Sequence, residues 1–139
     1  MTLKHIAVGA SLAVMVLLPV DAQASIFCDE IKLAVADARN SFNHVAPPGA
    51  LAESRLHLPG FGGCNVTRDS TPTFMCMTQR SNGVAVEDEL RACLSDWSMT
   101  YTPSPTVSTY FKDGVTVTLL RAQDAQQNWL VTLSIRAMP

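Results

Sequence analysis

The chain has 139 residues, of which 47% are hydrophobic and 16% are charged, and its formal net charge at pH 7 is −2. This length suits one ordinary domain rather than two, and the hydrophobic content excludes an intrinsically disordered chain. The slightly acidic balance excludes a nucleic-acid binder that works by neutralising phosphates.

The N-terminal segment, residues 1–24, has the pattern of a secretory signal peptide. Lys4 supplies the positive charge, residues 6–18 form an uncharged apolar run, and Ala22-Gln23-Ala24 has the small residues that precede a cleavage site. A transmembrane anchor would need about 20 apolar residues, and this run is shorter. We therefore expect cleavage after Ala24 and a single exported domain, residues 25–139, in a bacterial periplasm or secreted from the cell.

Four cysteines remain after this cleavage: Cys28, Cys64, Cys76 and Cys93. An even number of cysteines in a short exported chain predicts two disulfides. The closely spaced C-x2-C pairs of a structural zinc site or of a redox motif do not occur among them. A bulky Phe27 before Cys28 argues against attachment of a lipid at this first cysteine.

A hairpin is the predicted setting for the two central cysteines. Residues 64–68 and 73–79 have the pattern of strands, and the four residues 69–72 between them are turn formers. The antiparallel register that pairs Cys64 with Cys76 also pairs Val66 with Phe74. All four side chains then lie on one face, because side chains alternate along a strand.

Two helices are the predicted setting for the outer cysteines. Residues spaced by three and four predict the first helix, whose apolar face would contain Cys28, Ile31, Val35, Ala38 and Phe42. The second runs from about residue 84 to residue 97, and its apolar stripe includes Cys93. Its acidic residues 87–89 suit a helix start, where they would stabilise the helix dipole and face water.

We prefer the pairing Cys28–Cys93 with Cys64–Cys76, since antiparallel packing of the helices would bring their two cysteines together. The main alternative, Cys28–Cys64 with Cys76–Cys93, would tether the helices to the hairpin and stays open here.

The remaining segments complete an α+β domain. Residues 44–63 are rich in proline and glycine and predict a long loop, in which residues 51–56 would form a helical turn. Alternating patterns after residue 105 predict three strands of an antiparallel meander, with Asp113-Gly114 as a tight turn. The expected fold has two helices packed on an antiparallel sheet, in the order α-β-β-α-β-β-β, with two disulfides.

Binding without catalysis is the function that this pattern favours. We expect a disulfide-stabilised inhibitor, immunity protein or chaperone-like protein that acts on a protein partner in the cell envelope and needs no cofactor, nucleic acid or membrane span. Its contact surface would be the exposed side of the meander or the 44–63 loop. Aromatic and arginine side chains dominate interface energies, which makes the candidate contacts Arg55, His57, Phe61, Tyr101 and Tyr110.

Two alternatives involve chemistry. An envelope hydrolase could have a site scattered around His57, with Ser54 and Glu53, although no G-x-S-x-G motif is present. A Cu(I) site could use soft sulfur ligands, in a set made of Met75, Met77, a reduced Cys76, His44 and His57. In a strand, however, the two methionines would point away from the cysteine between them.

Overall fold

The computed structural model describes residues 20–79 and 81–139 of the chain. The signal peptide predicted for residues 1–24 falls mainly outside the described residues, and it stays a prediction.

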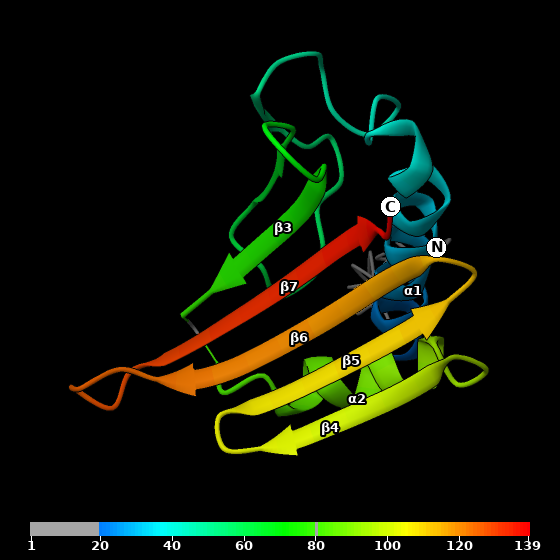
Figure 1. The fold of residues 1–139 in the computed structure, drawn as a ribbon. Helices are drawn as coiled ribbons and strands as arrows, with labels where there is room; N and C mark the ends of the chain where they lie inside the picture. The colour runs from blue at the N-terminus through cyan, green and yellow to red at the C-terminus, as the bar shows by residue number, and fades with distance from the viewer. Residues whose placement is uncertain (1–19, 80) are drawn as a thin grey trace, which may run out of the picture.

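Two helices lie against one face of a seven-stranded antiparallel sheet (Figure 1). The strand order across the sheet is β1-β2-β3-β7-β6-β5-β4. A short 3-10 helix, Ala38–Asn40, follows α1. The other bounds are α1 (Val20–Asp37), β1 (Leu51–Glu53), β2 (Cys64–Thr67), β3 (Thr73–Thr78), α2 (Val84–Cys93), β4 (Ser98–Pro103), β5 (Thr106–Lys112), β6 (Val115–Gln123) and β7 (Trp129–Ala137).

The predicted fold class and element order are confirmed, and two strands are added to them. The additions are the two edge strands, β1 and β4. The helical turn predicted for residues 51–56 is wrong, because residues 51–53 pair with β2 as the strand β1 and residues 54–56 are not helical. Pairing of β3 with β7 joins the hairpin to the meander in one sheet.

Both predicted disulfides and the hairpin register are confirmed. Cys28 of α1 is bonded to Cys93 at the end of α2, and Cys64 is bonded to Cys76. The β2–β3 ladder pairs Cys64 with Cys76 and Val66 with Phe74, and all four of these side chains are buried.

The core lies between the helices and the covered face of the sheet. On α1 the buried side chains are Phe27, Ile31 and Ala34, whereas Cys28 and Val35 are only half-buried. The buried face is therefore turned slightly from the predicted stripe, so that Cys28 sits at its border, where its sulfur reaches α2. Alternate residues of the central strands complete the core: Val115, Val117, Leu119, Val131, Leu133 and Ile135.

A single arginine fastens the loop that follows α1. The Arg68 guanidinium, just beyond β2, donates hydrogen bonds to the backbone carbonyls of Ser41 at 2.9 Å, Pro47 at 2.7 Å and Gly49 at 2.9 Å. In the same loop the ring of Phe42 lies 5.9 Å from the ring of Phe74 on β3. The loop is thus held to the hairpin by both polar and apolar contacts.

We expect Gly83→Ala to lower the free energy of unfolding by about 2 kcal/mol. Gly83 precedes α2 with φ of 77°, and an added Cβ would lie 2.9 Å from a Val131 methyl group. The left-handed backbone alone costs a residue with a Cβ about 1–2 kcal/mol, and the close contact adds to it. Urea denaturation measures the change.

Gly62→Ala is the matched control, since nothing lies within 4 Å of its added Cβ. It should change stability by less than about 0.5 kcal/mol. Equal effects of the two substitutions would contradict this account of how α2 begins.

Candidate functional site

In the part of the chain that the structure describes, the sheet face opposite the helices is not covered by the hydrophobic core. Figure 1 shows α1 and α2 on the same side of the sheet. The strand registers align the outward side chains of β3, β7, β6, β5 and β4 in three rows. They are Thr73-Arg136-Thr116-Phe111-Ser98, Met75-Ser134-Thr118-Thr109-Thr100 and Met77-Thr132-Leu120-Val107-Thr102. We call these fifteen residues the bare face.

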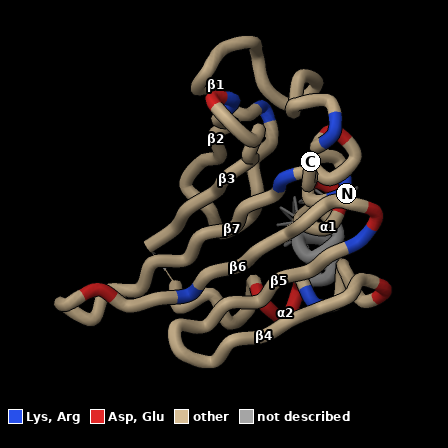
Figure 2. The backbone as a smooth tube through the Cα atoms, in the orientation of Figure 1, with Lys and Arg blue, Asp and Glu red and all other residues tan. Residues whose placement is uncertain are grey.

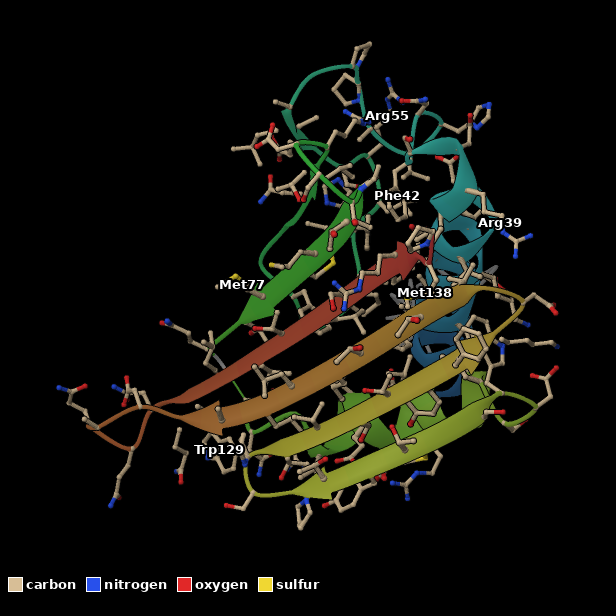
Figure 3. The ribbon with its side chains drawn as sticks, in the orientation of Figure 1. Arg39, Phe42, Arg55, Met77, Trp129 and Met138 are labelled. Carbon is tan, nitrogen blue, oxygen red and sulfur yellow. A yellow bond between two sulfur atoms is a disulfide. The ribbon has the colours of Figure 1, made fainter. Side chains whose placement is uncertain are left out.

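The bare face is rich in hydroxyl groups and nearly free of charge. Arg136 is its one charged residue, and Figure 2 shows long uncharged stretches along the strands. Met77 and Phe111 are each 48% exposed, and Figure 3 shows Met77 on β3. Depletion of charge together with exposed methionine and aromatic side chains is typical of the centre of a protein–protein interface.

The two edges of the sheet differ. All six residues of β4 are exposed, and this strand, Ser-Met-Thr-Tyr-Thr-Pro, has no charged residue. The opposite edge, β1, has three residues and carries Glu53. Short strands and charges are devices that protect a sheet edge from pairing with another chain, so β1 is protected and β4 is not.

The five predicted contact residues do not form one surface. Arg55, His57 and Phe61 lie in the segment between β1 and β2, with Phe61 half-buried against the core. Tyr101 is 52% exposed on β4, at the opposite edge of the sheet.

Tyr110, the fifth of these residues, lies inside the core. It is 1% exposed, and burial raises the pKa of its hydroxyl while Arg91 opposes the shift. Its position on β5 points toward the helices, so the exposed aromatic ring of that strand belongs to Phe111.

A second candidate site is a hollow of about 360 Å³ beside the end of α1. At its rim, the Asp37 carboxylate is hydrogen-bonded to Nδ1 of His44 at 2.7 Å. The Arg55 guanidinium donates to the backbone carbonyl of His44 at 3.0 Å, and Figure 3 shows Arg55 beyond the end of the sheet. Apolar side chains complete the hollow: Leu33, Ala36, Val45 and Leu56.

Asp37 is held as a carboxylate. Burial by itself raises its pKa, but hydrogen bonds from the His44 side chain, from the backbone N–H groups of His44 and Val45, and from Asn40 outweigh burial. The pKa of Asp37 therefore lies below its ordinary value of 3.8. The hydrogen bond between Asp37 and His44 orients the His44 ring. The hydrogen bonds that Asp37 accepts from the backbone of His44 and Val45 also hold the 41–46 loop in place.

Asp37 is not among the site residues predicted from the sequence, although its position in the helix is unusual. An acidic residue at the C-terminal end of a helix is unfavourable, because the helix dipole is negative there. The sequence pattern predicts a helix that continues to Phe42, whereas α1 ends at Asp37, so this unusual position becomes visible only once the end of the helix is known.

Asp88 at the start of α2 is exposed, but a buried ion pair corrects the prediction that Glu87 also faces water. Glu87 is buried and accepts hydrogen bonds from Arg121 at 2.5 Å and from Ser108 at 3.1 Å. Arg121 follows Val115, Val117 and Leu119 on the core-facing side of β6. A cation there needs a buried acid, and this interaction fixes α2 against β5 and β6.

The three residues suggested for a hydrolase do not form one site. Ser54 is buried and donates to the carbonyl of Val45, while Glu53 and His57 are exposed. The histidine that has an acidic partner is His44 rather than His57.

The structure does not bring the suggested copper ligands together. Cys76 is bonded to Cys64, and Met75 and Met77 lie on the other face of the strand. Within residues 20–79 and 81–139, no three His, Cys, Asp or Glu side chains are close enough to hold a metal ion. Among the helices of the described part, none is long and apolar enough to cross a membrane.

Comparison with known proteins found no match among protein-family models, curated proteins or solved structures.

We expect Asp37→Asn to destabilise the protein in a pH-dependent way. Because the folded-state pKa of Asp37 is lowered, its charge contributes stability that is complete above pH 3.8 and is lost as pH falls through the folded-state value. Hydrogen bonds to a charged group contribute about 1.5–3 kcal/mol. At pH 5 the variant should be less stable by about this amount, and the difference should shrink towards pH 2.

Denaturant unfolding at several pH values between 5 and 2 measures this difference. Asp29→Asn, at an exposed position of the same helix, is the control and should leave the difference near zero. A loss at Asp37 that stays constant over this range would show that the carboxylate charge is not what stabilises the loop.

Proposed function

We propose that the protein is a small exported binding protein that docks a protein partner onto its bare face. The observation that carries the proposal is the combination, on one exposed sheet face, of almost no charge with exposed Met75, Met77 and Phe111. Two disulfides, and described helices too short or polar to span a bilayer, are consistent with a periplasmic or secreted protein.

The dimensions of this face indicate a small interface. The five strands of the bare face, spaced by about 4.8 Å, span roughly 19 Å, and strands of six to nine residues are about 20–30 Å long. The resulting area of roughly 400–600 Å² is below the ~800 Å² that each partner contributes to an ordinary stable interface, and it suits a smaller, transient one. The partner surface that fits it is itself poor in charge, since an unpaired charge buried against these hydroxyl and methyl groups would be costly.

The disulfides support a role in binding a partner rather than in catalysing a reaction on it. They fasten the two helices and the hairpin behind the bare face, so the face is preorganised and loses little freedom on binding. An inhibitor, immunity protein or chaperone-like protein acts through a preformed surface of this kind.

The test places a lysine at the centre of the bare face. Thr118 lies in the middle row on β6, and Thr118→Lys should weaken partner binding at least about tenfold, because it buries an unpaired charge. Mature oxidised protein carrying a photocrosslinker at Thr132 is exposed to the native envelope fraction, and the crosslinked partner is identified by mass spectrometry. Its affinity is then measured with purified components.

Ala92→Lys, at an exposed position of α2, is the matched control and should bind as the unchanged protein does. The proposal is overturned if Thr118→Lys binds equally well, or if Ala92→Lys is the variant that fails. It is also overturned if the only crosslinked product is a second copy of this chain.

A further inference from the structure

We propose that β4 pairs with β4 of a second copy, antiparallel and with Thr100 on the two-fold axis, so that the two sheets become one. This inference concerns the edge of the sheet and stands independently of the partner proposed for the bare face.

The first observation is the free edge itself. β4 is bound to β5 along one side and ends the sheet. In an antiparallel ladder every second residue directs its N–H and C=O groups away from the neighbouring strand, so β4 presents a row of unused backbone groups. Its six residues are exposed and uncharged, and such an edge is a template for another strand.

Charge does not oppose a second copy at this edge. The charged groups that flank β4 are Asp96, two residues before it, and Lys112 at the end of β5, and these two form an ion pair. The pairing lowers the pKa of Asp96 and raises that of Lys112. Two copies therefore meet along neutral strands with their nearest charges already compensated.

Symmetry restricts the register. Both strands of a two-fold pair use the same set of outward-directed residues, so one residue must lie on the axis. An axis at Thr100 pairs Ser98 with Thr102 of the second copy and keeps Pro103, which has no N–H to donate, outside the ladder. The ladder then uses five residues of each strand.

The side chains are complementary in this register. On the side of the bare face, Thr100 meets its own copy and Ser98 meets Thr102, and such hydroxyl pairs stabilise antiparallel strands. On the other side, Met99 of each copy meets Tyr101 of the other, and both are exposed in one copy, at 38% and 52%. A thioether against an aromatic ring is a favourable contact.

The opposite edge explains why the assembly would stop at two copies. A β4 edge that paired with β1 of another copy would repeat without end, as head-to-tail contacts do. β1 is short and carries Glu53, which disfavours that arrangement. Pairing of β4 with itself uses both free edges and leaves a protected β1 at each end.

The first experiment is cysteine crosslinking of the mature oxidised protein. Thr100→Cys would place two cysteines opposite each other with Cα atoms about 5.5 Å apart, within the range of a disulfide. It should form a covalent dimer under mild oxidation. Ser98→Cys is the control, because in this register its two copies are about 13 Å apart, and it should stay uncrosslinked while the native disulfides persist.

The second experiment measures mass in solution by light scattering and analytical ultracentrifugation. The unchanged protein should be a dimer at about 0.1 mM, and Thr100→Lys should weaken the dimer at least about tenfold because it places two positive charges on the axis. Thr118→Lys should leave the dimer intact.

A monomer at that concentration would overturn the inference. So would a dimer that Thr100→Lys leaves unchanged, or equal crosslinking through Ser98→Cys. The two proposals fail separately because their readouts differ: mass in solution reports the dimer, and affinity for the crosslinked partner reports binding to the bare face. Thr118→Lys should change only the second, since Thr118 lies away from the β4 edge.

Discussion

The bond between Cys28 and Cys93 is the constraint on which the rest of this architecture depends. It joins α1 to the last residue of α2, so the two helices must lie on the same side of the sheet. Helices on opposite faces would have buried both sides of the central strands. With both helices on one side, burial of apolar area, the main driving force of folding, acts on that side alone.

Because side chains alternate along each strand, the sheet has one buried face and one outward face along its length. Residues such as Val117 and Leu133 are fully buried, while their neighbours Thr118 and Thr132 face outward. On the helix side, the ion pair between Glu87 and Arg121 fixes α2 against β6. The molecule thus has one side specialised for stability and one side available for contact.

Local pattern was sufficient to predict the hairpin, both disulfides and the order of the main elements. The hairpin was accessible because a single register aligned two cysteines with Val66 and Phe74. The edge strand β4 was missed although residues 98–102 alternate between polar and apolar types. The alternation is short and runs directly into Pro103-Ser104-Pro105, which is typical of a connection, and both sides of the strand are exposed. The Glu87–Arg121 and Asp37–His44 pairs join residues 34 and seven positions apart, and pairing over such spacings depends on tertiary structure.

The hydrogen bonds of Arg68 affect the local unfolding of the loop after α1. Its guanidinium binds carbonyl groups of the 41–49 loop, and the hairpin from which it extends is closed by Cys64–Cys76. The loop also contains the backbone N–H groups that bind Asp37. Amide hydrogens of the loop and of β2 should therefore exchange with solvent as one cooperative unit. The hollow beside His44 then keeps its shape for as long as the adjoining hairpin stays folded.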